Sequence, residues 1–332
     1  MVTIPEISVI IPTYNRKDWL PDVLDSLAEQ TVPLDEFEVI VVDDGSQDGT
    51  GAIIDKEFPF RFRYAHQTNQ GDAEARNAGA RLSQAKLLVF LDDDMVVAPD
   101  YLLCLCAEAR DHPQRIVAGT EHIWLEDTNP LKVLPPKKRV SLVDQDRVGI
   151  HFSKVYSNNM CIWREAYWVI GPMESLGFSG SSIWCDVEFT YRAHLLGYEF
   201  VRSTRALCFH RNYVYLNLDN HSRRMEEAAF RAAAMFHKHA GLVNYLPMFD
   251  DKTPVNLNED PPRMVVRKLV RRVASTRPML WILEQIIGLV AGVKSSSHLL
   301  VPLQRWLVGG YIFRGYRNGL RKLQRTGKLS HG

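Results

Sequence analysis

Short apolar runs alternate with amphipathic segments along the first third of the chain. Runs rich in β-branched residues occupy residues 7–11, 38–42, 62–66, 87–91 and 116–119. Segments in which apolar residues recur every three or four positions occupy residues 18–30, 48–58, 72–82 and 100–109. Continuous apolar runs are typical of buried parallel strands, and their alternation with helices predicts an α/β fold. We therefore expect a Rossmann-like, mostly parallel sheet flanked by helices.

The middle of the chain is less regular. Residues 121–151 have weak periodicity, several prolines and the basic run Lys137-Lys138-Arg139, which together indicate a long loop that serves as a lid or contacts a substrate. Beyond this loop, apolar runs predict strands at residues 157–163, 199–202 and 206–209, and helical spacing predicts helices at residues 186–196 and 223–239.

A proline-rich segment then changes the character of the chain. Residues 246–262 carry prolines and acidic or amide side chains, as linkers do. The helical stretches that follow are apolar on one side and rich in Lys and Arg on the other, at residues 263–273, 278–293 and 299–325. We expect a first domain over residues 1–245, a linker over residues 246–262 and a basic amphipathic helical region over residues 263–332.

Charge is distributed unevenly along the chain. The 40 Lys and Arg residues nearly balance 39 Asp and Glu residues, so the net charge of +1 argues against nucleic-acid binding. Residues 263–332 nevertheless hold 14 Lys and Arg residues and one acid, Glu284. Basic amphipathic helices with aromatic residues bind at anionic membrane surfaces. We expect peripheral attachment to the inner face of the cell membrane, with a helical docking or dimerisation face as the alternative.

Cysteine usage and the N-terminus bear on the compartment. The five cysteines (Cys104, Cys106, Cys161, Cys185 and Cys208) show no CxxC pair and no zinc-site spacing, which predicts buried free thiols in a reducing compartment. The first residues lack a basic segment followed by an apolar core, so no secretory signal is expected. No stretch of 18 uninterrupted apolar residues predicts a membrane span. These patterns favour a cytoplasmic protein.

Two acidic clusters directly follow predicted strands. Asp43-Asp44 follows residues 38–42, and Asp92-Asp93-Asp94 follows residues 87–91. The carboxyl ends of the strands form the ligand-binding edge of such a sheet. Adjacent carboxylates repel one another unless a cation is present, and Mg²⁺ or Mn²⁺ prefers carboxylates together with substrate phosphates. The second cluster therefore predicts a metal–diphosphate site, or else a solvated acidic turn. The first predicts a carboxylate that recognises a base or ribose, or else a capping turn.

Four sequence blocks together carry a family resemblance. In order, they are residues 8–16 (SVIIPTYNR), 41–50 (VVDDGSQDGT), 69–79 (NQGDAEARNAG) and 90–94 (FLDDD). The set resembles the inverting family 2 glycosyltransferases of the GT-A fold over residues 7–101, and more loosely to about residue 240. The resemblance implies a catalytic domain over residues 1–245, with a nucleotide-sugar half (1–120) and an acceptor half (121–245).

The resemblance also implies roles for individual residues. Asp44 would recognise the nucleotide base, Arg76 would lie near the diphosphate, and Asp94 would ligate Mn²⁺ or Mg²⁺. His210 would be a second metal ligand, as in some relatives, or else a histidine packed under the following loop. The remaining donor contacts that the resemblance implies are Pro12, Thr13, Tyr14 and Asn15 in the opening turn, and Asp92 and Asp93 near the ribose and sugar.

The general base of the family aligns with Asp186. The acid that precedes this base in the family is replaced here by Cys185. Glu188 is the fallback base, or else a solvated charge on a helix face. Trp184 and the run Gly180-Ser181-Ser182 are expected to form a wall of the acceptor site, with packing in the core as the alternative for Trp184.

The resemblance implies a metal-dependent transferase. It would move a sugar with inversion from a nucleotide diphosphate sugar, with a UDP-sugar favoured, to a hydroxyl of a glycan or lipid-linked acceptor. One alternative is a catalytically silent nucleotide-sugar-binding module, which Cys185 favours. Another is a nucleotidyltransferase, which would need a basic phosphate-binding loop where this chain has residues 12–15.

Overall fold

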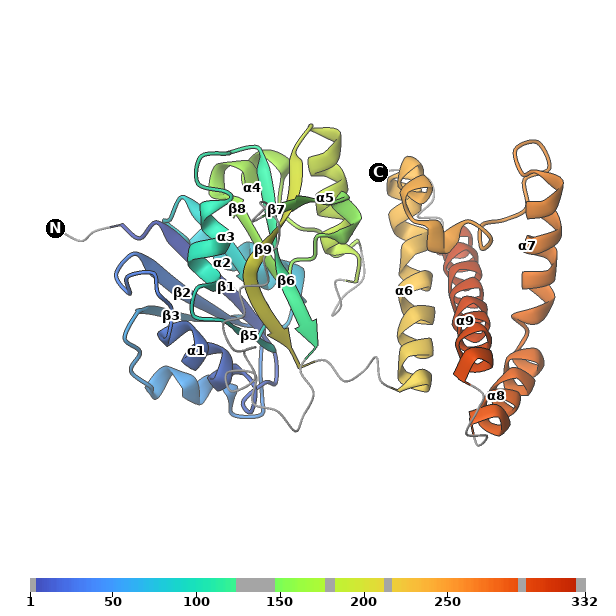
Figure 1. Cartoon of the computed structure of the whole chain (residues 1–332), viewed down its shortest axis with the longest axis horizontal. Coiled ribbons are helices and arrows are strands. Elements are labelled where there is room, and N and C mark those ends of the chain that lie inside the picture. The colour runs from blue at the N-terminus through green and yellow to red at the C-terminus, as the bar shows by residue number, and fades with distance from the viewer. Residues whose placement is uncertain (1–3, 124–146, 177–182, 212–216, 292–296, 327–332) are drawn as a thin grey trace. The chain divides into compact units, whose positions relative to one another are not determined.

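The chain divides into two compact units, Met1–Asn212 and Tyr213–Gly332 (Figure 1). The computed structural model describes residues 4–123, 147–176, 183–211, 217–291 and 297–326. The division falls before helix α6 (Leu218–Lys238), whereas the hydrophobic pattern places it near residue 245. The expected linker, residues 246–262, accordingly lies within the second unit.

The first unit is built on one mixed sheet. Its strands, in the order in which they pair, are β3 (Arg61–His66), β2 (Phe37–Asp43), β1 (Ile7–Thr13), β4 (Leu87–Leu91), β8 (Asn159–Trp163), β6 (Arg115–Ile123), β9 (Glu199–His210) and β5 (Met95–Val97), with β7 (Arg147–Gly149) beside β9. The first four are parallel, and so are β6 and β9. Strand β8 runs antiparallel to β4 and β6, and β5 and β7 run antiparallel to β9. The predicted α/β class is confirmed, and the parallel order holds in the β3-β2-β1-β4 half.

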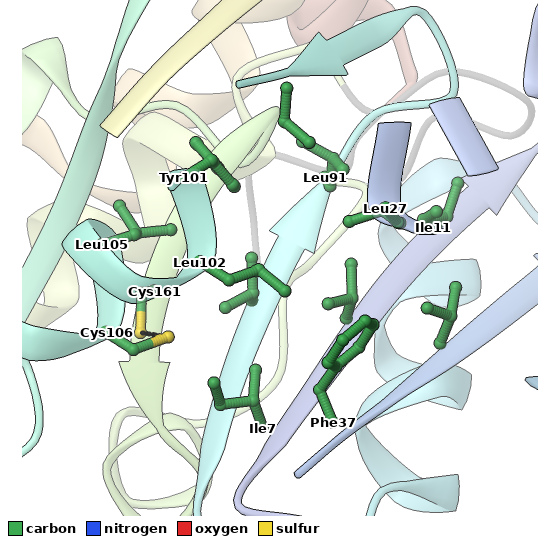
Figure 2. Close-up of a cluster of buried hydrophobic side chains, with 14 of the residues drawn as sticks. Ile7, Ile11, Leu27, Phe37, Leu91, Tyr101, Leu102, Leu105, Cys106 and Cys161 are labelled. Carbon is green, nitrogen blue, oxygen red and sulfur yellow. Dashed lines mark hydrogen bonds between the residues drawn. The ribbon is translucent and has the colours of Figure 1, made fainter. Parts of the chain in front are cut away.

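Helices cover both faces of this sheet. Side chains at alternate positions of β1, β2 and β4 pack against α1 (Leu20–Ala28) and α3 (Tyr101–Ala107) in the main core (Figure 2). The intervening positions face α2 (Asp72–Leu82), whose Gly79 lies so close to Ile10 that a Cβ would fall 2.3 Å from its Cγ2. Phe90 on that face contacts Tyr167 of α4 (Arg164–Ile170), which contacts Phe189 of α5 (Cys185–Leu195).

All five cysteines are buried and free, as their spacing predicts. The sulfurs of Cys106 and Cys161 lie 3.9 Å apart. Figure 2 shows the two side chains beside each other. This separation is far longer than the roughly 2.05 Å of a disulfide bond. Both thiols therefore belong to the apolar core.

Three segments of the first unit differ from the predicted elements. Residues 50–55 form a 3-10 helix (Thr50–Asp55) after the left-handed Gly49, in place of the longer helix expected at residues 48–58. The two strands expected at residues 199–202 and 206–209 form one strand, β9, which pairs with β6 across an irregularity at Ala118 and Thr120. Of the expected lid, residues 124–146 lie outside the described residues.

The second unit contains the helices that the basic tail predicts. They are α7 (Pro262–Ala274), α8 (Arg277–Ala291) and α9 (Ser297–Thr326), together with α6 and the short 3-10 helices Ala240–Tyr245 and Pro247–Phe249. Gly315 and Gly319 of α9 lie directly against the backbone carbonyls of Glu226 and Phe230 of α6, where any side chain would clash. This close packing places α6 with the tail. Within the described part of the chain, no helix has the length and apolarity needed to cross a bilayer.

Candidate active site

The acidic clusters lie at the carboxyl edge of the parallel strands, as predicted. Thr13 at the end of β1 pairs with Asp43 at the end of β2, and β1 is also parallel to β4, after which Asp92 follows. Loops at this edge of an α/β sheet are the usual ligand-binding position. The structure thus brings the β1 turn, the Asp43-Asp44 pair and the Asp92–Asp94 cluster to one edge.

The turn after β1 is tied to the loop after β2. Asn15 has a left-handed backbone with φ of 54°. Its side-chain Oδ1 accepts a hydrogen bond from the amide of Gln47 at 2.9 Å, and its own amide donates to Ser46 Oγ at 2.8 Å. Pro12 and Thr13 are buried within the strand, whereas Tyr14 is 49% exposed. Among these four expected donor contacts, Tyr14 and Asn15 are the exposed residues.

Asp44 organises the loop that begins α2. Its carboxylate accepts hydrogen bonds from the amides of Gln70 (2.8 Å) and Gly71 (2.7 Å), and from Gln67 Nε2 at 2.7 Å. Gly71 adopts a positive φ of 93° at the start of the helix. Recognition of a base by Asp44 stays a prediction, and it would have to coexist with these three hydrogen bonds.

Arg76 is buried between two carboxylates. Its guanidinium donates to Asp72 at 2.8 Å and to Asp92 at 2.5 Å, while its Nε is buried without a hydrogen-bond partner in the described part of the chain. Burial lowers the pKa of Arg76, but Asp92 and Asp72 outweigh it and hold the pKa well above its usual value. Asp72 was not among the predicted site residues, although its position four residues before Arg76 on the predicted helix signals such a pair. Arg76 is thus a permanent positive charge beside Asp92.

Asp93 faces the β1 turn. Arg16 Nε lies 3.5 Å from its Oδ1, and Arg16 also stacks over Trp19. Burial and the neighbouring charge of Asp94 raise the pKa of Asp93 to about 7, against the opposing effects of Arg16 and Thr13. Burial also raises the pKa of Asp92, although Arg76 opposes it. The cationic side chains of the described residues therefore neutralise the negative charges of Asp92–Asp94 only in part.

Strand pairing brings Asp94 to His210. The register of β5 against β9 places Met95 opposite His210, so Asp94 lies next to the imidazole. His210 Nε2 lies 3.4 Å from Asp94 Oδ1, and Nδ1 lies 2.7 Å from Glu121 Oε1. Burial lowers the pKa of His210, but the two carboxylates outweigh it and raise the pKa to about 10. Glu121 was not among the predicted site residues, because the weak periodicity after residue 121 predicts a lid there instead of the strand β6.

The side chains around Asp94 fit a divalent cation. Asp94 Oδ1 is buried and makes no hydrogen bond of ordinary geometry within the described residues. A carboxylate oxygen and an imidazole nitrogen are suitable donors for Mn²⁺. Across the described ranges, no group of three or more His, Cys, Asp or Glu side chains is arranged to hold a metal by itself. A cation here would need further ligands, which the phosphates of a substrate supply in many Mg²⁺ and Mn²⁺ sites.

Asp186 lies in the first turn of α5. It is half-buried, and its Oδ1 accepts a hydrogen bond from the amide of Val187 at 2.8 Å. Burial raises the pKa of Asp186 to about 6, with the Val187 amide and Arg76 opposing the increase and Asp72 and Asp92 adding to it. Asp186 therefore lies within electrostatic range of the Arg76–Asp92 pair. Residues 180–182 of the expected acceptor wall lie outside the described residues.

Cys185 replaces an acid with a neutral group. Its thiol is buried, and burial together with Asp72 and Asp186 raises its pKa well above the usual value. Trp184 before it has a left-handed backbone with φ of 77°. The base candidate thus has no ionised neighbour immediately before it in the chain.

Glu188 has a structural role. It is fully buried, and both its carboxylate oxygens accept hydrogen bonds from Arg192 Nε, at 3.1 and 3.0 Å. Arg192 also donates to the carbonyls of residues 170–172 after α4. The interpretation of Glu188 as a solvated helix-face charge is wrong, and its ion pair leaves Asp186 as the better base candidate.

The Arg192 contacts predict a large loss of stability on mutation. Arg192→Ala would leave Glu188 buried without its cation and would free three backbone carbonyls. We expect the free energy of unfolding to fall by about 3–5 kcal/mol, measured by urea denaturation. Arg110→Ala, which removes an exposed pair with Glu6, is the control and should cost less than about 1 kcal/mol. Equal losses for the two variants would contradict this role.

Comparisons with known proteins bear on the family and the fold of this chain. Residues 8–157 match the family model described as Glycosyl transferase family 2. Validoxylamine A glucosyltransferase of Streptomyces hygroscopicus subsp. jinggangensis is 32% identical over an alignment of 226 residues, and the match covers 58% of this chain and 52% of the relative. The putative glycosyltransferase EpsH of Bacillus subtilis is 24% identical over an alignment of 253 residues, and the match covers 72% of this chain and 69% of that relative. This chain thus spans about half the length of the validoxylamine enzyme.

Solved structures show the same fold. The mannosyltransferase PcManGT of Pyrobaculum calidifontis superposes with a TM-score of 0.56 and 18% identity, over 94% of this chain and 87% of that one. S. aureus TarS superposes with a TM-score of 0.51 and 16% identity, over 96% and 55% of the two chains. The fold is therefore that of the GT-A glycosyltransferases. The predicted resemblance to glycosyltransferase family 2 is confirmed over residues 8–157.

Proposed function

We propose that this chain transfers a sugar, with inversion, from a nucleotide diphosphate sugar to an acceptor hydroxyl in a metal-dependent reaction. One observation carries the proposal: the Asp92–Asp94 cluster and the half-buried Asp186 lie in electrostatic range of each other around Arg76. The mannosyltransferase PcManGT, in complex with GDP-Man and Mn²⁺, supports a nucleotide-sugar donor and a divalent cation. A UDP-sugar remains our first choice of donor, and a GDP-sugar is the second.

In the proposed reaction Asp186 acts as the general base. An acceptor hydroxyl attacks the anomeric carbon in line with the leaving nucleotide, while Asp186 removes the hydroxyl proton. A general base needs its proton-free form at the working pH, and a pKa of about 6 provides it near neutrality. Direct attack by the acceptor requires no covalent intermediate on the protein.

The charges around the base assist departure of the nucleotide. Asp94 and His210 would hold Mn²⁺ or Mg²⁺, which when bound neutralises negative charge on the leaving diphosphate. Arg76 adds a fixed positive charge, with its buried Nε as an unused donor. Tyr14, which is exposed directly after β1, would contact the nucleotide. Such preorganised charges are often the largest contribution to catalysis.

The pH dependence of transfer tests the base. Because the pKa of Asp186 is raised to about 6, its carboxylate is protonated below that pH and ionised above it. We expect kcat, with saturating donor and Mn²⁺, to fall as the pH decreases through about 6 and to level off above about 7. If Asp186→Asn retains a measurable kcat, that kcat should not show this fall at low pH. An identical fall in the variant would assign the titration to another group.

A catalytically silent module is the second candidate function. The neutral, buried Cys185 at the position of a family acid is the observation that favours it. Binding of a nucleotide sugar without release of nucleotide, in the presence of Mn²⁺ and a range of hydroxyl acceptors, would support this module over the transferase.

We also propose that the second unit attaches to an anionic membrane, as suits a lipid-linked or cell-surface glycan acceptor. Helix α8 exposes large apolar side chains, among them Trp281 (60% exposed) and Leu289 (75%). Burial of each such side chain in a membrane interface contributes about 1.5–3 kcal/mol.

Substitution of these apolar side chains tests membrane attachment. We expect Trp281→Ser/Leu289→Ser to reduce sedimentation of the chain with phosphatidylglycerol vesicles by at least about tenfold. The control Val169→Ser/Leu257→Ser replaces two exposed apolar residues outside α7, α8 and α9. It should sediment as the wild type does. Equal sedimentation of all three proteins would contradict the proposal.

A further inference from the structure

Five arginines of the second unit converge on one cavity. This cavity, which we name the arginine groove, has a volume of about 410 Å³. It is lined by side chains from the end of α7, the start of α8, the middle of α9 and one position of α6. The charged residues among them are Arg272, Arg277, Arg314, Arg317, Arg321 and Glu226.

One carboxylate partly neutralises the arginine groove. Glu226 accepts two hydrogen bonds from Arg314, both at 2.6 Å, in a bidentate pair. This pair uses both oxygens of Glu226. Within the described part of the chain, no acidic side chain forms an ion pair with Arg272, Arg317 or Arg321. The groove therefore holds three guanidinium groups that pair with no carboxylate of the described residues.

The unbalanced charges affect one another. Burial lowers the pKa of Arg317, and the positive charges of Arg321 and Arg272 lower it further. Repulsion of this kind destabilises the empty groove, and an anion bound between the guanidinium groups would relieve it. The nearby hydroxyls of Ser275 and Thr276 donate to the carbonyls of Arg271 and Val273 and carry no charge, so they do not balance the charges of the arginines.

Guanidinium groups match one class of anion well. The planar fork of arginine donates two parallel hydrogen bonds to phosphate oxygens, and clusters of arginine bind phosphates with two or more negative charges. We propose that the arginine groove binds a phosphomonoester or diphosphate group. The group belongs either to a soluble molecule or to the head of a lipid. This inference concerns the second unit and does not depend on the proposed sugar transfer.

The test compares a groove variant with a variant of equal charge. Arg317→Gln/Arg321→Gln removes two groove arginines, and Arg263→Gln/Arg325→Gln removes two exposed arginines that do not line the groove. Binding of inorganic diphosphate to each full-length protein is measured by calorimetry in buffer stripped of divalent metal, so that metal-dependent binding in the first unit does not contribute. We expect the groove variant to bind at least about tenfold more weakly and the control to stay within about twofold of wild type.

A second arm identifies the source of the phosphate. Sedimentation is compared for phosphatidylcholine vesicles that contain about one fifth of either phosphatidic acid, a phosphomonoester, or phosphatidylglycerol, a diester. A preference for phosphatidic acid that is lost in the groove variant and kept in the control would support a lipid head group. Diphosphate binding that depends on the groove, without this preference, would support a soluble ligand. Wild-type protein that binds neither probe, or equal losses in both variants, would overturn the proposal.

Discussion

Replacement of Asp186 by Asn is expected to lower the transfer rate by about 10²–10⁴-fold, the usual contribution of a general base. Asn has nearly the same shape but cannot accept a proton from the acceptor hydroxyl at neutral pH. Donor affinity should change little, because in the proposed reaction Asp186 contacts the acceptor hydroxyl and not the diphosphate of the donor. Steady-state kinetics and calorimetry with the donor separate the two effects.

The control for Asp186→Asn is the same substitution at an Asp elsewhere in the first unit. Asp25→Asn alters an exposed carboxylate on α1 and should transfer sugar at the wild-type rate. If Asp186→Asn keeps most of its activity, the base is assigned wrongly. Loss of donor binding together with activity would instead indicate that Asp186 shapes the donor site.

Asp94→Asn is expected to abolish the dependence of donor binding on divalent cations. The variant keeps the size of the side chain but removes the charge that, beside His210, would hold the metal. Loss of the metal removes several kcal/mol of charge stabilisation, so we expect transfer to fall by about 10²-fold or more. Donor affinity titrated with and without Mn²⁺ measures the first effect.

The control for Asp94→Asn is the same substitution at an Asp outside the Asp92–Asp94 cluster. Asp111→Asn replaces an exposed Asp on the same unit and should retain Mn²⁺-dependent binding. A donor affinity of Asp94→Asn that still rises with Mn²⁺ as in wild type would remove Asp94 from the metal site.

Much of the first unit could be predicted because the local hydrophobic pattern of its strands matches their burial in the sheet. Strands such as β1, β2 and β4 are buried along their whole length, so their continuous apolar runs identify them without knowledge of their neighbours. Acidic residues at the ends of two such strands must then meet at one edge. The position of Asp92–Asp94 follows from this reasoning.

Other features depend on long-range pairing that the pattern does not encode. Strand β9 continues through the polar residues 203–205 because β6 pairs with both of its halves, so one strand replaces the two expected. The same pairing places Glu121 beside His210, 89 positions away in the chain. Glu188 is charged and adjacent to the base candidate, and only the contact with Arg192 shows that it is buried.

The local hydrophobic pattern also does not show where the chain divides into its two units. Helix α6 has the spacing of an ordinary surface helix, and the prolines after it resemble a linker. Its placement in the second unit depends on Gly315 and Gly319 of α9, which allow the two backbones to touch. These two glycines lie far from α6 in the chain, so the local pattern of α6 does not reveal the contact.

A donor screen tests the central claim most directly. UDP-, GDP- and dTDP-sugars are incubated with wild type and Asp94→Asn, with and without Mn²⁺, and release of nucleotide is followed over time. The proposed function predicts slow, metal-dependent release from one donor by wild type and its loss in the variant. Release that is equal without Mn²⁺, or equal in Asp94→Asn, would contradict a metal-dependent transferase site at this sheet edge.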